Sequence, residues 1–105
     1  MISQDVVDIA RAERETLRWV LLSALWYARP YGTSEYVLLR TAQDIPLIVT
    51  QDLVRREMDS LASRGLIAIE RDNQPLWHAK ITALGEDVVD FRAPVPPGIA
   101  RPPKW

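Results

Sequence analysis

The sequence contains no cysteine and only one histidine, His78. The lack of cysteine excludes disulfide frameworks, thiolate zinc sites and cysteine nucleophiles together. A catalytic or metal-binding role for His78 needs partner residues that the pattern does not supply, so we expect a surface histidine next to Glu70 on a neighbouring strand. There is also no glycine-rich phosphate loop. We therefore predict that the chain is not an enzyme and uses no cofactor or metal.

The sequence has little net charge, with 13 basic and 14 acidic residues and a formal charge of −1. Proteins that bind DNA strongly without sequence preference usually carry a basic excess, because neutralising phosphates supplies much of their affinity. However, 11 of the 13 basic residues are arginine, which suits bidentate contacts to phosphate or guanine. Composition leaves DNA binding open.

Long hydrophobic runs are missing too. The densest one, from Trp19 to Ala28, is interrupted by Ser23 and is too short to cross a bilayer. The segment from Met1 to Asp5 lacks the basic residues of a secretory signal. We expect a cytoplasmic protein with no membrane contact. A chain of 105 residues with 48% hydrophobic residues suits one domain, which we place at residues 1–92, followed by a tail at 93–105.

The first predicted helix is long and covers residues 3–28, with Ser3 as its N-cap. One apolar stripe with helical spacing includes Leu17, Leu21 and Leu25. A second apolar row lies on another side of the same helix, and it must be covered by something. Either the hairpin or the tail packs there, or the row forms a homodimer contact. The candidate residues for this dimer or tail contact are Trp19, Leu22, Trp26 and Trp105.

Two further helices are expected at residues 34–44 and 51–64. Ser34 and Thr50 are suitable N-caps, and Gly65 follows the third helix where a left-handed glycine commonly ends one. Pro46 disfavours helical geometry at the residue before it and so fixes the break between the two helices.

Two short strands should follow, because Ile67 and Ile69 alternate with polar or small residues, as Trp77, Ala79 and Ile81 also do. Residues 71–75 form the turn of this hairpin. Thr82 is a suitable N-cap for a fourth helix, expected to reach Phe91. The acidic residues Glu86, Asp87 and Asp90 in that helix are explained by the helix dipole without any metal ion.

The tail from Ala93 holds five of the eight prolines, which excludes a helix or a central strand. We expect an extended segment that is either loose or laid along a surface. It can act as a docking peptide for a protein partner. Alternatively, Ile99 and Trp105 fold back onto the row that contains Trp19 and Trp26.

Two sequence patterns, Leu61-x-x-x-Gly65-Leu66-Ile67 and Ile81-Thr82-x-x-Gly85, resemble those of winged helix-turn-helix regulators of the MarR and PadR type. The resemblance covers residues 17–91. The short length and the proline-rich tail are also similar to small winged-helix proteins of Mu-like transposable phages. The implied fold is mainly α with a small β-hairpin, a long N-terminal helix and an extended tail. The implied location is the cytoplasm of a bacterial cell or of a phage-infected host.

The resemblance implies double-stranded DNA as a partner, a homodimer, and a role in transcription regulation or phage DNA handling. The third helix (residues 51–64) would enter the major groove, and the wing (residues 66–82) would contact the neighbouring backbone. The alternative is a protein–protein adaptor that does not bind DNA. The near-neutral charge favours that alternative. On the third helix, Arg55 and Arg56 can instead simply solvate the surface and pair locally with Asp59 and Asp52. The candidate DNA-binding residues are Gln51, Arg55, Arg56, Arg71, Asn73, Gln74 and Lys80.

Overall fold

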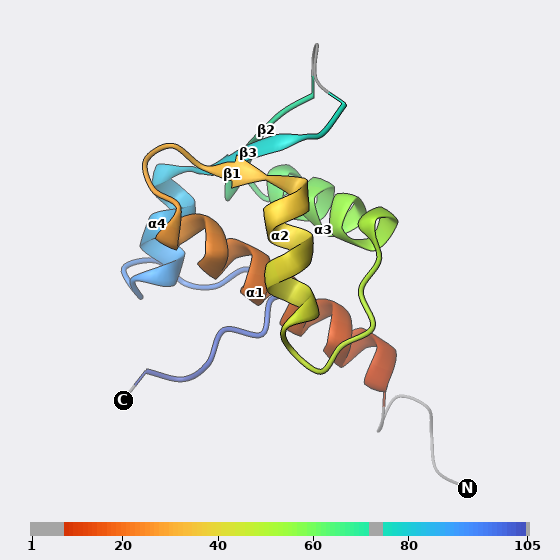
Figure 1. Cartoon of the computed structure of the whole chain (residues 1–105). Helices are drawn as coiled ribbons and strands as arrows, with labels where there is room; N and C mark the ends of the chain where they lie inside the picture. Colours follow the sequence, from red (N-terminus) through yellow and green to blue (C-terminus); the bar gives the residue numbers. More distant parts are fainter. Residues whose placement is uncertain (1–7, 72–74, 105) are drawn as a thin grey trace, which may run out of the picture.

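The computed structural model describes residues 8–71 and 75–104. These residues form four helices and a three-stranded antiparallel sheet (Figure 1), so the expected mainly helical class with a small β-hairpin is confirmed. The elements in chain order are α1 (Ile9–Tyr27), β1 (Thr33–Ser34), α2 (Glu35–Gln43), α3 (Gln51–Ser63), β2 (Ile67–Glu70), β3 (His78–Ile81) and α4 (Ala83–Val89).

The sheet contains one strand that the sequence did not predict. Its order is β1-β3-β2, with Thr33 opposite Ala79 and Ile67 opposite Ile81. Gly32 precedes β1 with a φ of 75°, and a Cβ at this position would collide with the carbonyl oxygen of Ala79. A glycine is therefore needed for β1 to approach β3 so closely.

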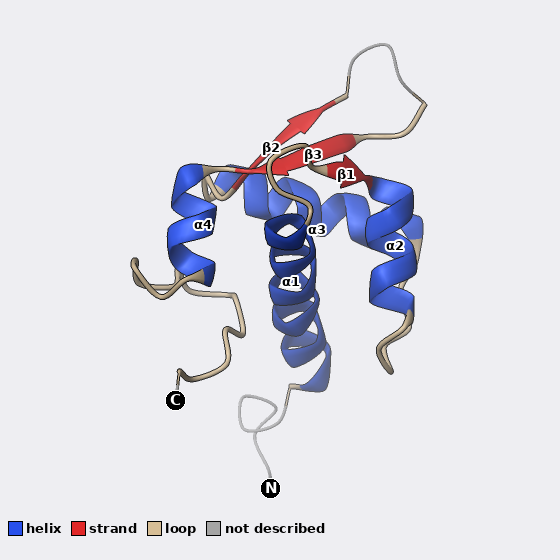
Figure 2. Ribbon diagram, turned by 60° about the vertical axis from the view of Figure 1, so that its left-hand side comes forward, coloured by secondary structure: helices blue, strands red, loops and turns tan. Residues whose placement is uncertain are grey.

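The core lies around α1, which runs through the middle of the molecule with α4 and α2 on either side (Figure 2). Leucines of α1 pack with apolar residues of α2, α3, the sheet and α4. Leu22 is fully buried here, so at this residue the second row is covered by the chain itself, which was one of the two alternatives. It therefore offers no contact to a second chain. The fully buried apolar side chains of this core include Leu21, Leu22, Leu25, Leu38, Val54, Met58, Leu61, Leu66 and Val88.

Side-chain caps fix the start of each helix. As predicted, Ser34, Thr50 and Thr82 each accept a hydrogen bond from the backbone N–H of the residue three positions later. The cap of α1 is Asp8, whereas the predicted cap Ser3 lies outside the described residues. The described part of the first helix therefore begins at Ile9.

The ends of α3 and α4 are joined through one threonine. The hydroxyl of Thr82 donates to the carbonyl of Gly65 at 2.7 Å and accepts from the N–H of Gly85 at 3.1 Å. Gly85 lies against the carbonyl of Leu66, where a Cβ would collide, so a glycine here lets α4 lie close to its neighbour. The fourth helix ends at Val89 rather than at Phe91.

The first part of the tail lies along the helical body, and its last residues run away from it (Figure 1). Ile99 is only 7% exposed and belongs to the core cluster, against which Ala93 and Val95 also pack. Of the two expectations for the tail, the surface-bound one describes residues 93–101, whereas Pro102, Pro103 and Lys104 are exposed. None of the described helices is both long and apolar enough to cross a membrane.

Candidate interface on helix α3 and the hairpin

Helix α3 and the hairpin are joined to α2 through one buried carboxylate. The side chain of Glu35 is fully buried at the start of α2. Its two oxygens accept from Arg55 Nε and NH2, both at 2.6 Å, in a bidentate pair. They also accept from Gln51 Nε2 at 3.2 Å and from the backbone N–H of Trp77 at 2.8 Å. Each oxygen therefore has two donors, so the buried charge is well compensated.

The electrostatics of this network follow from its geometry. The hydrogen bond from Arg55 is the largest influence and holds the pKa of Glu35 below its ordinary value, against the opposing effect of burial. The same hydrogen bond raises the pKa of the Arg55 guanidinium. Both groups are therefore charged at neutral pH.

Trp77 on the hairpin extends the network to the next arginine. The guanidinium carbons of Arg55 and Arg71 lie 4.6 and 4.3 Å from the centre of the Trp77 ring, within the range of a cation–π interaction. Arg71 also forms an ion pair with Asp59 of α3. The local pairing expected between Arg55 and Asp59 is therefore wrong, because each residue pairs with a more distant part of the chain.

The predicted DNA-contacting residues divide into three groups. Gln51 and Arg55 bond to Glu35, and Arg71 bonds to Asp59, so their polar groups already have protein partners. The exposed Arg56 and Lys80 form no ion pair with any described carboxylate, so the expected pair of Arg56 with Asp52 is not formed. Asn73 and Gln74 lie outside the described residues.

A second buried glutamate lies on the opposite side of α3. Glu57 is 1% exposed, and its Oε1 accepts from Arg18 Nε at 2.7 Å. Its Oε2 is buried without a hydrogen-bond partner among the described residues. Arg18 also donates through NH1 to the carbonyl of Gly98 in the tail at 2.8 Å.

The sequence reasoning missed both buried glutamates. A signal existed for Glu57, because it falls between Val54, Met58 and Leu61 on the apolar stripe of α3. No comparable signal marks Glu35, which follows the N-cap, a usual place for an exposed acidic residue. Its burial results from Arg55 and Trp77, which are distant in the sequence.

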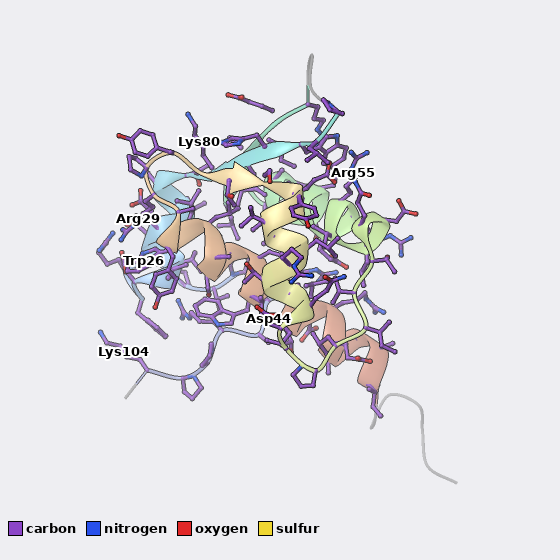
Figure 3. All side chains as sticks on the ribbon, in the orientation of Figure 1. Trp26, Arg29, Asp44, Arg55, Lys80 and Lys104 are labelled. Atoms are coloured by element: carbon purple, nitrogen blue, oxygen red, sulfur yellow. The ribbon has the colours of Figure 1, made fainter. Side chains whose placement is uncertain are left out.

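The tryptophan row contributes to a different surface. Trp19 is half-buried against the core. Trp26 lies under the guanidinium of Arg29, 3.7 Å from the ring centre. Trp26 and Arg29 line an open depression of about 410 Å³ together with Tyr27, Pro30 and Glu86. Figure 3 places Trp26 and Arg29 on the opposite side of the molecule from Arg55. Trp105, the last member of the predicted group, lies outside the described residues.

Neither His78 nor the acidic residues of α4 form a metal centre within the described part of the chain. His78 lies opposite Glu70, as expected, and its Nε2 is 2.9 Å from the carbonyl oxygen of Tyr31. Asp87 and Asp90 pair with Arg92, whose pKa is raised chiefly by its hydrogen bond to Asp87. Residues 8–71 and 75–104 contain no group of three or more potential metal ligands.

No protein-family model matches this chain, and no curated protein sequence is similar to it. Its function must therefore be argued from its own geometry.

Proposed function

We propose that this chain is a winged-helix protein that binds double-stranded DNA with α3 and the β2–β3 hairpin. The element order supports this fold, because α2 and α3 are followed at once by a hairpin that projects beyond the helices (Figure 1). In this arrangement α3 lies in the major groove and the hairpin lies beside the adjacent phosphates.

The observation that carries the proposal is the Glu35 network. Arg55 bonds to Glu35 of α2 and donates to the carbonyl of Pro75 in the hairpin, while its guanidinium lies over Trp77. These contacts fix the hairpin relative to α3, so two protruding elements are held in one geometry before any ligand binds. A rigid pair of this kind loses little conformational freedom on binding.

In this proposal Arg55 orients the binding elements and Arg56 contacts DNA. Arg56 is exposed on α3 and Lys80 on β3, and neither is neutralised by a described carboxylate. Arginine donates two parallel hydrogen bonds to guanine or phosphate, whereas lysine acts as a point charge on phosphate. With so few unpaired cations, nonspecific binding should be weak and should disappear readily as salt is added.

The test is binding to a pool of random DNA duplexes across a salt series. The comparison is between the unaltered chain, Arg56→Ala and the matched control Arg92→Ala, which removes an exposed charge beyond α4. Loss of one phosphate contact lowers the slope of log K against log salt by about 1, and loss of a guanine contact costs about 1–3 kcal/mol. We expect one of these effects for Arg56→Ala and neither for Arg92→Ala. Equal behaviour of the two variants, or no binding at low salt, contradicts the proposal.

The second candidate is a protein–protein adaptor, and one observation favours it. Arg55 and Arg71, two of the expected DNA contacts, are neutralised by Glu35 and Asp59. Elsewhere on the surface large apolar side chains are exposed, with Ile48 at 92%. If DNA fails to bind, these surfaces become the place to search for a protein partner.

A further inference from the structure

The tail is bound mainly through its main chain. Arg64 Nε donates to the carbonyl of Pro97 at 3.3 Å, and Arg18 NH1 donates to the carbonyl of Gly98 at 2.8 Å. The N–H of Ala100 donates to the carbonyl of Glu15 at 3.1 Å. We call the part of the body that makes these bonds the tail-binding surface, defined by Glu15, Arg18 and Arg64.

Two side-chain features make this binding selective for one short segment. Gly98 has a φ of 92° and lies between the two guanidinium groups. This φ strains any residue with a side chain, and a Cβ here would also displace the flexible ends of Arg64 and Arg18, whose nearest nitrogens are 2.7 and 2.9 Å away. The next residue, Ile99, is buried in the core. The surface therefore fits a segment that turns at a glycine and continues with a large aliphatic residue.

The turn that leads into the tail is strained. Phe91 has a φ of 62°, a left-handed conformation that costs an ordinary residue about 1–2 kcal/mol. The turn directs the chain from the end of α4 back onto its own body, where the N–H of Ala93 donates to the carbonyl of Asp87 at 3.1 Å. An extended backbone at Phe91 removes the strain and directs the tail away from its own body.

We propose that two copies of this chain exchange their tails, so that residues 93–104 of each copy occupy the tail-binding surface of the other. The contacts to Pro97, Gly98, Ile99 and Ala100 are the same whichever copy supplies the segment. Exchange therefore keeps these bonds and relieves both strained turns, at the cost of association entropy. The dimer should form as protein concentration rises. This assembly is independent of DNA binding.

A disulfide can distinguish the two arrangements because the chain has no cysteine of its own. Residues 15 and 100 are joined by a main-chain hydrogen bond, so Glu15→Cys and Ala100→Cys place two thiols on adjacent backbones. The full-length double variant is separated by size exclusion with light scattering, oxidised, and analysed by denaturing electrophoresis without reductant. We expect covalent dimers from the dimer fraction and internally linked monomers from the monomer fraction.

Three results would overturn the proposal. A chain that stays monomeric up to millimolar concentration does not exchange its tail. A dimer fraction that yields only internally linked monomers uses another interface. Failure to form the disulfide in either fraction means that the tail does not occupy this surface in either arrangement.

Two substitutions at the hinge provide a matched comparison. Phe91→Gly accepts the left-handed turn without strain, whereas Phe91→Val disfavours it strongly. Both variants lose the contact between the Phe91 ring and the guanidinium of Arg101, 4.3 Å from the ring centre. We expect Phe91→Gly to lower the dimer association constant by about tenfold per hinge and Phe91→Val to raise it. Equal association constants for the two variants would contradict the role of the hinge.

Discussion

The two buried glutamates show how differently one chain can hold a charge in its interior. Glu35 receives four hydrogen bonds from three residues, shared equally between its two oxygens. Glu57 receives one, from Arg18, and its second oxygen has no partner in the part of the chain that the structure describes. Both are about 1% exposed. The two sites therefore differ in how many donors compensate the buried charge, and not in how deeply the side chain is buried.

The two sites have different mechanical consequences. The donors around Glu35 come from α3 and the hairpin, so this site joins three elements in one geometry. Arg18 divides its donors between Glu57 and the tail, and the tail also depends on Arg64. A carboxylate whose oxygens all accept hydrogen bonds holds the donor elements in one geometry. A carboxylate with an unbonded oxygen constrains the neighbouring segment less.

The largest effect should follow from removing Arg55. Arg55→Ala leaves the carboxylate of Glu35 buried with only Gln51 and Trp77 as donors, and breaking a buried pair in this way costs about 3 kcal/mol of unfolding free energy. The exposed Arg56→Ala on the same helix is the control and should change stability by about 0.5 kcal/mol or less. Urea unfolding measures both. Similar losses for the two variants would show that the Glu35 network contributes little.

A smaller effect should come from acid. Because Arg55 holds the pKa of folded Glu35 below its ordinary value, the unfolded chain takes up this proton first as the pH falls. The stabilisation is complete above about pH 5 and is lost progressively below the unfolded pKa of about 4.3. The difference in unfolding free energy between the unaltered chain and Glu35→Gln should be constant from pH 7 to 5 and should shrink towards pH 3. A difference that grows on acidification would reverse the assigned sign.

The smallest effect should come from Glu57→Gln. The amide oxygen still accepts from Arg18, and an amide NH2 takes the place of the oxygen without a hydrogen bond, so one buried polar group lacks a partner in both forms. We expect a change of about 1 kcal/mol or less in unfolding free energy, because the lost ion pair and the removed desolvation cost offset each other. Thermal unfolding of Glu57→Gln beside Glu35→Gln measures this directly. A larger loss for Glu57→Gln than for Glu35→Gln would break the contrast between the two sites.

Much of the fold could be predicted because its signals are local. Ser34, Thr50 and Thr82 were recognised as caps from their place before apolar periodic segments, and Gly65 from its place after one. Strands β2 and β3 were visible in the alternation of apolar residues. Strand β1 was missed because two residues are too short to show any period.

The site was harder to predict because its contacts are distant in the sequence. Glu35 and Arg55 are 20 residues apart, and Arg18 and Glu57 are 39 apart. Helical spacing suggested local partners for Arg55 and Arg56, but it carries no information on pairing across elements. The binding of the tail depends in the same way on arginines of α1 and α3 that have no sequence signal for this role.

The single hydroxyl of Thr82 couples the end of one helix to the start of another. It bonds to Gly65 after α3 and to Gly85 within α4, while the N–H of Thr82 donates to the carbonyl of Leu66 at 3.0 Å. Opening the first turn of α4 to solvent should therefore also expose the carbonyls of Gly65 and Leu66, which follow α3. We therefore expect the two helix ends to unfold locally as one cooperative unit, so that their amides exchange hydrogen for deuterium together.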